Sequence, residues 1–280
     1  MQSRLARIAV ALTCAVGLIA SGAATAAAKA PRAKASVIGG TPASLTDWGF
    51  TAAIVTPHTL CTGSVISPTK VLTAAHCVSS PQTMAVRTNS TQAFTGGDVH
   101  PVSFAAVNPD WTHGFIGDVA VLTLATPTSA PPIQLASTTE DPALTAPRAA
   151  VSVAGFGARN PAPRRKPKIG LLTTATVFVR GFCPLPASLV CDAGGRSGLV
   201  AISKIRRKVR KRSIQRTVCA GDSGGPMVAA SPAGPRLVGI AEATSAPPKR
   251  SAFGFVWCGL KGFPAIHTRV ASYLGFIQGS

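Results

Sequence analysis

Short runs in which apolar and polar residues alternate, bounded by turn-forming residues, recur along most of the chain and predict β-strands. The expected strands are Thr51–Thr56, Val65–Ile66, Val71–Thr73, Val119–Leu124, Val151–Ala154, Thr174–Val179 and Leu237–Ile240. Helical spacing is visible mainly near the C-terminus, where the apolar face comprises Val270, Tyr273, Leu274 and Ile277. The pattern therefore predicts an all-β fold that ends in a short helix, at about residues 269–278.

The N-terminal segment has a different pattern. Residues 1–28 carry Arg4 and Arg7, then an apolar run from Ile8 to Ala20 and a string of small residues. This order is typical of a secretory signal peptide, so the segment is left out of the fold. A lipoprotein signal built on Cys14 fits less well, because that cysteine lies inside the apolar run. No other segment has the roughly 18 consecutive apolar residues needed to cross a bilayer, and we expect a secreted, extracellular protein without a membrane anchor.

Cysteine usage agrees with export. The chain has seven cysteines, and Cys14 leaves with the signal peptide. The even number that remains predicts disulfide bonds among Cys61, Cys77, Cys183, Cys191, Cys219 and Cys258. Six cysteines allow fifteen pairings, so the pattern alone does not select one. No C-x2-C pair occurs, which disfavours a zinc site, and we expect neither a metal nor a cofactor.

Three short motifs carry the candidate chemistry. The segment Cys219–Pro226 places Ser223 among glycines, where the backbone can turn sharply and approach a substrate. A serine hydroxyl is a weak nucleophile unless a base takes its proton and a third group holds that base. Thr-Ala-Ala-His-Cys supplies His76, and Asp-Val-Ala-Val-Leu supplies Asp118 at the head of an apolar run.

Along the chain the three motifs come in the order His76, Asp118, Ser223. In this order they resemble those of the chymotrypsin/trypsin family of serine endopeptidases and not those of subtilisins or α/β-hydrolases. The resemblance implies two six-stranded antiparallel barrels packed face to face, with a short C-terminal helix. The first barrel is expected at about 37–140 and the second at about 141–268. The resemblance also implies that Ser223 attacks the peptide carbonyl, His76 transfers the proton and Asp118 orients His76. The backbone N–H groups of Gly221 and Ser223 would form the oxyanion hole.

The same resemblance implies an activation step. Residues 29–36 would be a short propeptide, and Val37-Ile38-Gly39-Gly40 looks like the family's mature N-terminus. The freed amine of Val37 would pair with Asp222, because a buried carboxylate without a partner is costly. Ser36 precedes the bond instead of Arg or Lys, so we expect another secreted protease to cut it.

The family pattern also selects the disulfides Cys61–Cys77, Cys183–Cys191 and Cys219–Cys258. It gives no reason to expect calcium, because the segment where some relatives bind that ion, Ser79–Val99, contains a single acid, Asp98. The remaining histidines lack a matching context and are expected to be surface or packing residues: His58, His100, His113 and His267.

The primary specificity pocket departs from a trypsin-like pattern. Its floor would be Thr217, where an acid would select Arg or Lys, and its walls would be Ala243 and Ala265 in place of the usual glycines. This combination predicts cleavage after small or medium uncharged residues.

The strand before that pocket departs further. In this alignment Ala241 takes the place of a serine that supports the catalytic acid, and Glu242 takes the place of an aromatic residue under the substrate. Glu242 would then either attract a basic substrate residue or be a solvated charge at the rim. The insertion Thr244–Trp257 has no counterpart in the pattern.

The formal charge of +19 is concentrated in two segments. Arg159–Lys168 carries five basic residues, and the stretch from Lys204 to Arg216 carries eight. Family topology places both in second-barrel loops. They are either solvated or self-cleaved loops or a site for an anionic polymer. No aromatic residue interleaves with them, so sequence-specific nucleic-acid binding is not expected.

Two hypotheses follow. The first is a secreted, monomeric serine endopeptidase that acts on proteins or peptides. The second is a non-catalytic or weakly active homologue that binds anionic polymers through its basic loops. The presence of all three triad motifs favours the enzyme.

Overall fold

The computed structural model describes residues 37–112, 114–158, 169–181, 183, 185–194, 196–205, 208–244, 258 and 264–280. For residues 193–194, 196–205, 208–214 and 243–244 only the backbone is described. All belong to the unit formed by residues 33–280. The predicted signal peptide and propeptide, His113, the basic segment Arg159–Lys168 and insertion residues 245–257 lie outside the described residues.

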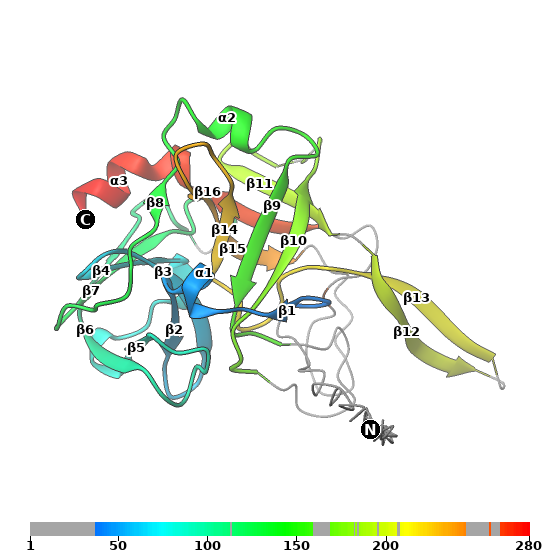
Figure 1. The fold of residues 1–280 in the computed structure, drawn as a ribbon, viewed down its shortest axis with the longest axis horizontal. Coiled ribbons are helices and arrows are strands. Elements are labelled where there is room, and N and C mark those ends of the chain that lie inside the picture. The colour runs from blue at the N-terminus through cyan, green and yellow to red at the C-terminus, as the bar shows by residue number, and fades with distance from the viewer. Residues whose placement is uncertain are drawn as a thin grey trace, which may run out of the picture. The chain divides into compact units, whose positions relative to one another are not determined.

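The first barrel is a closed ring of six antiparallel strands in the order β2-β3-β4-β7-β6-β5 (Figure 1). The strands are β2 (Thr51–Val55), β3 (Leu60–Ser67), β4 (Lys70–Thr73), β5 (Ala85–Thr88), β6 (Asp98–Val107) and β7 (Ala120–Leu124). Closure leaves no free sheet edge, which is how small antiparallel barrels satisfy their backbone groups.

The second barrel closes through six strands in the order β9-β10-β11-β16-β15-β14, with β14 pairing back to β9. The strands are β9 (Ala150–Gly155), β10 (Thr173–Val179), β11 (Leu189–Gly194), β14 (Pro226–Ala229), β15 (Arg236–Thr244) and β16 (Ala265–Arg269). Two short strands extend this sheet: β1 (Thr41–Pro42) pairs with β10, and β8 (Gln134–Leu135) runs parallel to β15. The predicted all-β, two-barrel fold is confirmed.

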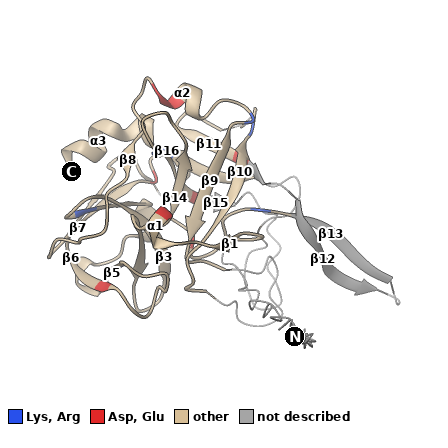
Figure 2. Cartoon of the chain, in the orientation of Figure 1, with Lys and Arg blue, Asp and Glu red and all other residues tan. Residues whose placement is uncertain are grey.

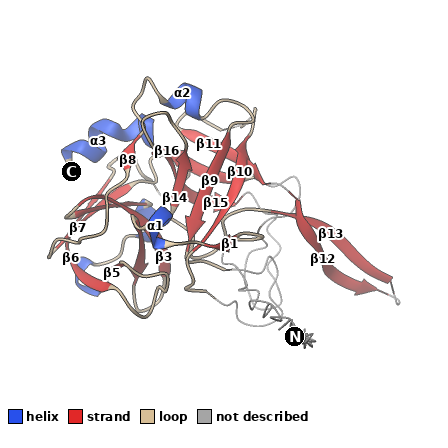
Figure 3. Ribbon diagram, viewed as in Figure 1, coloured by secondary structure: helices blue, strands red, loops and turns tan. Residues whose placement is uncertain are grey.

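Helical elements are short (Figure 3). The α-helices are α1 (Leu45–Trp48), α2 (Asp141–Leu144) and α3 (Leu274–Gly279), and the 3-10 turns are η1 (Ala75–Cys77), η2 (Pro81–Thr83) and η3 (Val270–Tyr273). The predicted C-terminal helix is therefore a 3-10 turn followed by α3. Within the described part of the chain, no helix combines the length and apolar character that a membrane crossing requires.

Strand alternation builds the barrel interiors. Along β10, the buried positions Thr173, Ala175, Val177 and Val179 alternate with more exposed ones, as a period of two requires. Ala175, Val177 and Val179 join the core of the second barrel. Each expected strand is found, and most are longer than the apolar run that predicted them.

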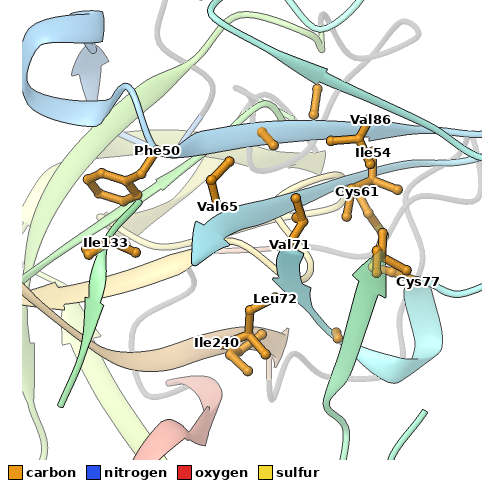
Figure 4. Packing of buried hydrophobic residues seen from close by; sticks show 14 of the residues in the cluster. Phe50, Ile54, Cys61, Val65, Val71, Leu72, Cys77, Val86, Ile133 and Ile240 are labelled. Atoms are coloured by element: carbon orange, nitrogen blue, oxygen red, sulfur yellow. A yellow bond between two sulfur atoms is a disulfide. The ribbon is translucent and has the colours of Figure 1, made fainter. Parts of the chain in front are cut away.

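A larger apolar cluster joins the two barrels (Figure 4). Ile54, Val71 and Leu72 of the first barrel belong to the same buried cluster as Leu237 and Ile240 of β15. The cluster also includes Val270 and Ile277 from the expected apolar face of the C-terminal helix. Residues of both barrels thus share one hydrophobic core.

The basic stretch expected as a loop forms a hairpin instead. Strands β12 (Arg196–Ile205) and β13 (Lys208–Gln215) pair with each other and with no other described strand. Several β-branched residues in these strands favour this pairing over an irregular loop. Elsewhere, Figure 2 shows charged residues only sparsely distributed over the described barrels.

Candidate active site

His76 and Asp118 are brought together by the first barrel. His76 lies in η1, directly after β4, and the Cys61–Cys77 disulfide ties this turn to β3. The Nδ1 atom of His76 is 2.6 Å from Oδ2 of Asp118, and the backbone N–H of His76 donates to Oδ1 at 2.8 Å. Because a carboxylate accepts, Nδ1 carries the proton, and in a neutral imidazole Nε2 is then the acceptor. Asp118 is 2% exposed and His76 is 36% exposed, so the acid is buried and the base reaches solvent.

The position of Asp118 is fixed by the residues around it. It lies two residues before β7 and directly after Gly117, whose N–H donates to the Tyr273 hydroxyl at 3.0 Å. The amide of Asn108 donates to the Gly117 carbonyl at 3.1 Å. The hydroxyl of Thr268 in β16 lies 3.2 Å from the Asp118 carbonyl oxygen and donates to it. Both barrels and the C-terminal turn therefore hold the acid.

Ser223 lies in the turn before β14. Gly221 has a φ of 94° and Gly224 a φ of 79°, which is backbone that glycine adopts without strain. A Cβ on Gly224 would lie 2.0 Å from Oγ1 of Thr73, because the turn packs directly against the segment leading to His76. The sulfur of Cys77 lies 3.6 Å from the Ser223 carbonyl oxygen. The serine turn and the histidine turn are therefore in contact.

The backbone donors of this turn are divided into two groups. The N–H groups of Asp222, Gly224 and Gly225 each donate within the fold, to carbonyls of Cys219, Ala241 and Asp222 respectively. Within the described ranges, no residue accepts from the N–H of Gly221 or Ser223. Both donors expected to bind an oxyanion thus lack an internal acceptor there.

Asp222 is fully buried beside this turn. Its Oδ1 accepts from the Gly157 N–H and its Oδ2 from the Cys219 N–H, both at 2.8 Å. Burial raises the pKa of Asp222 to about 7, although the two backbone donors lower it. No ion pair with Asp222 is present among the described residues.

Val37 is also fully buried, but its nitrogen has another partner. It is a peptide nitrogen in this chain, because Ser36 precedes it, and it donates to Oγ1 of Thr173 at 2.6 Å. Thr173 pairs with Gly155, where a Cβ would lie 2.2 Å from the Asp222 carboxylate. The residue pair Thr173 and Gly155 therefore contacts Val37 on one side and Asp222 on the other.

The expected specificity residues lie in the second barrel. Thr217 is buried and forms an isolated bridge with Ile38, and its hydroxyl has no partner among the described residues. Ala265 begins β16 and is fully buried. Ala243 lies in β15, with only its backbone described.

The places that the family alignment assigned to Ala241 and Glu242 are wrong. Ala241 packs in the core of the second barrel, with Val37 and Met227, and does not support the acid. Glu242 is 7% exposed, which excludes a solvated rim charge. Its Oε2 lies 3.0 Å from Oγ1 of Thr268, the same hydroxyl that lies 3.2 Å from the Asp118 carbonyl oxygen. A β-bulge between Ala241 and Ala243 explains the error, because an extra residue re-aims the side chains of its strand.

Glu242 is electrostatically coupled to the candidate triad. Burial and the neighbouring negative charge of Asp118 raise the pKa of Glu242 to about 8, and the hydrogen bond from Thr268 lowers it. Its Oε1 has no hydrogen-bond partner in the described part of the structure. At neutral pH this carboxyl group is therefore mostly protonated.

Thr62 of β3 is a site residue that sequence reasoning missed. Its hydroxyl donates to the Gly221 carbonyl at 2.9 Å and accepts from the Phe156 N–H at 3.2 Å. Its backbone N–H donates to the Ser223 carbonyl at 2.8 Å. One first-barrel threonine thus holds the serine turn, and a threonine in a strand gives no signal of this in the sequence.

A second missed feature is the buried pair of Asp192 and His267. His267 Nε2 and Asp192 Oδ2 are 2.8 Å apart, and both side chains are essentially unexposed. Asp192 lies opposite Ala265 in the register of β11 and β16. His267 is thus a packing residue, as expected, but it is paired with an acid 75 positions away, and no local motif announces such a pair.

The three disulfides pair as predicted: Cys61–Cys77, Cys183–Cys191 and Cys219–Cys258. Cys61, His76 and Cys77 form the one cluster of metal-ligating residue types among the described residues. Because the two sulfurs are joined to each other, neither is a thiolate that could bind a metal.

Comparisons with known proteins agree with this arrangement. The family model "Trypsin" matches residues 37–277. The chain is 30% identical over 254 residues to "Trypsin" of Saccharopolyspora erythraea, covering 85% of this chain and 94% of that protein. It is 28% identical over 271 residues to "Serine protease 56" of Homo sapiens, covering 90% of this chain and 40% of that protein. It is 23% identical over 275 residues to "Trypsin CFT-1" of Choristoneura fumiferana, covering 89% and 93%.

Proposed function

Because the chain belongs to the trypsin family, we propose that it is a secreted serine endopeptidase whose triad is Ser223, His76 and Asp118. The observation that carries this proposal is the two-point contact between His76 and Asp118, beside the glycine turn that holds Ser223. An imidazole held in this tautomer presents Nε2 as a base, which is what a serine nucleophile needs.

The proposed reaction has two halves. Nε2 of His76 takes the Ser223 proton as Oγ attacks the peptide carbonyl, and the carbonyl electrons move onto the oxygen. The N–H groups of Gly221 and Ser223 stabilise that oxyanion, a contribution of about 100- to 1000-fold per donor. His76 then protonates the leaving amine, and water releases the acyl-enzyme through the same groups. Asp118 stabilises the imidazolium in both halves.

We propose a preference for small or medium uncharged residues before the cleaved bond. The support comes from the sequence: no acid stands at Thr217, the expected floor, and Ala243 and Ala265 stand where the resemblance expects glycines at the walls. An unpaired cation buried there would lack a counter-charge on the pocket floor.

Activation is proposed to follow release of the Val37 amine. The support is that Val37 is buried and contacts Thr173, whose register partner Gly155 packs against Asp222. A free ammonium at this point would give the Asp222 carboxylate the cation that it lacks among the described residues.

A second candidate activity, binding of anionic polymers, rests on the charge of one element. The segment 196–215 carries eight Lys or Arg and no acid, and its strands β12 and β13 pair only with each other among the described strands. Binding there would accompany peptidase activity and would weaken with salt.

We propose that the enzyme acts as a monomer.

A serine-reactive fluorophosphonate tests the central proposal. We expect the form that begins at Val37 to be labelled once, at Ser223, and the Ser223→Ala variant to remain unlabelled. Intact mass and N-terminal sequencing identify the labelled form. Absence of labelling with a correct Val37 terminus and a cooperative unfolding transition would remove the enzyme proposal and leave the binding one.

A further inference from the structure

Glu242 is a buried acid that the catalytic scheme above does not use. It reaches the triad through one hydroxyl, because Oγ1 of Thr268 lies 3.0 Å from Glu242 Oε2 and 3.2 Å from the Asp118 carbonyl oxygen. A threonine hydroxyl has a single proton and donates one strong hydrogen bond at a time. The protonation state of Glu242 therefore decides where the Thr268 proton points.

Two arrangements are possible. When Glu242 is neutral, its own O–H donates to Thr268 Oγ1, and Thr268 donates to the Asp118 carbonyl, which completes a chain of two hydrogen bonds. When Glu242 is ionised, its carboxylate only accepts and draws the Thr268 proton to itself. The Asp118 carbonyl then loses this donor, and a second negative charge faces the acid.

The charged groups around Glu242 are few among the described residues. From the segment before β7, Asp118 faces it, with His76 beyond. On β16, His267 neighbours Thr268 but is engaged by Asp192. From η3, Tyr273 binds Gly117, next to Asp118. From the serine turn against β15, Asp222 is held by Gly157 and Cys219.

We propose that Glu242 is a positioning residue for Asp118, which in its neutral form orders the acid through Thr268 and on ionisation releases it. This inference rests on the proposed peptidase function and assigns a role that no sequence motif of the chain announces. Its consequence is a loss of turnover on the alkaline side, in the range where Glu242 loses its proton.

The experiment compares kcat for an ester substrate from pH 6 to pH 10 in the Val37 form of the wild type, Glu242→Gln and Thr268→Val. The glutamine amide is a donor at every pH and keeps the chain intact. We expect wild-type kcat to fall about fivefold on the alkaline side, the effect of losing one hydrogen bond, and Glu242→Gln to lack that fall. Thr268→Val breaks the chain at every pH and should show a low kcat, with an alkaline fall smaller than that of the wild type, because only the charge of Glu242 then acts on Asp118. All three share the Val37 amine, so its titration cancels in the comparison.

A second readout does not depend on turnover. The proton on His76 Nδ1 reports the state of Asp118, and its NMR shift should titrate with an additional alkaline step in the wild type that Glu242→Gln lacks. Coincident profiles of wild type and Glu242→Gln in both measurements would overturn the inference and leave the peptidase standing. A wild type without esterase activity or fluorophosphonate labelling at any pH would instead overturn the proposed function. If Glu242→Gln does not fold, Glu242→Ser serves as the second variant that lacks the ionisable group.

Discussion

Thr62 shows how a single side chain couples the two barrels at the candidate site. It is fully buried, and three of its hydrogen bonds reach Gly221, Ser223 and Phe156. Two of these bonds hold the carbonyls on either side of Asp222. The shape of the turn that carries the Gly221 and Ser223 N–H groups, the donors of the proposed oxyanion hole, therefore depends in part on a residue of the opposite barrel.

Replacing Thr62 by Val tests this coupling. Valine has the shape of threonine but leaves the Gly221 carbonyl and the Phe156 N–H without their buried partner, at a cost of about 1–3 kcal/mol. We expect a lower melting temperature and a kcat that falls by at least about fivefold, because the turn loosens. Calorimetry and active-site-titrated kinetics measure the two effects.

The matched control is Thr62→Ser, which retains the hydroxyl and loses a methyl group. It should keep kcat near the wild-type value. An equal kcat in the wild type and Thr62→Val would contradict the role given to this hydroxyl. So would an equal loss of kcat in Thr62→Val and Thr62→Ser.

At the scale of elements, the sequence predicted strand β15 but not the bulge within it. The apolar run Leu237–Ile240 correctly predicted the strand, but the places of Ala241 and Glu242 came from the family alignment, which did not include the bulge. One extra residue moves the next side chain to the other face, so the acid expected at the surface lies against Asp118.

The hairpin β12–β13 is the second element that differs from expectation. Its charge density indicated a loop, whereas its β-branched residues, spaced among basic ones, form paired strands. Arg196 and Gln215 are register partners, so the two ends of the hairpin lie side by side and the barrel strands do not depend on it.

Replacing residues 196–215 with Asn-Gly should therefore leave the barrels intact. We expect the melting temperature and fluorophosphonate labelling of the Val37 form to remain at wild-type values. Retention on a heparin column should end at lower salt, because eight cations are lost.

A variant that keeps the hairpin but carries Lys208→Gln, Arg210→Gln, Lys211→Gln and Arg212→Gln is the matched control. It should also elute earlier, since charge and not the strand pair is proposed to bind. Wild-type retention in both variants would contradict the polyanion proposal, and loss of folding in the replacement would contradict the independence of the hairpin.

At the scale of the whole molecule, the fold and the local motifs were predictable, and the long-range polar contacts were not. The motifs around His76, Asp118 and Ser223 are contiguous, so the sequence identifies them. The Asp192–His267 pair and the contacts of Thr62 join residues far apart in the chain, and only the closed barrels bring them together. The resemblance implies an ion pair between the freed Val37 amine and Asp222; in the chain with Ser36 attached, the Val37 N–H donates to Thr173.

The buried Asp222 carboxyl group, which has no ion-pair partner among the described residues, determines how the stability of the precursor responds to pH. Asp222 has an ordinary pKa of 3.8 and a folded-state pKa of about 7, so the folded state binds its proton more tightly than the unfolded state. The stability that this group contributes is fully present below about pH 4 and is lost as pH rises to about 7, by roughly 4 kcal/mol at most. If the freed Val37 amine pairs with Asp222 as proposed, we expect the cation to lower the pKa of Asp222 and to reduce this loss.

Urea unfolding between pH 4 and pH 8 measures the effect, with Ser223→Ala present throughout to prevent self-cleavage. We expect the precursor to lose more stability across this range than the form beginning at Val37. The Asp222→Asn precursor should lack the Asp222 part of the loss, judged from the slope with pH and not from absolute stability, because the amide repels one of the two backbone donors. Parallel slopes for precursor and Asp222→Asn would show that Asp222 is already ionised and stabilised before cleavage, and would separate activation from the Val37 amine.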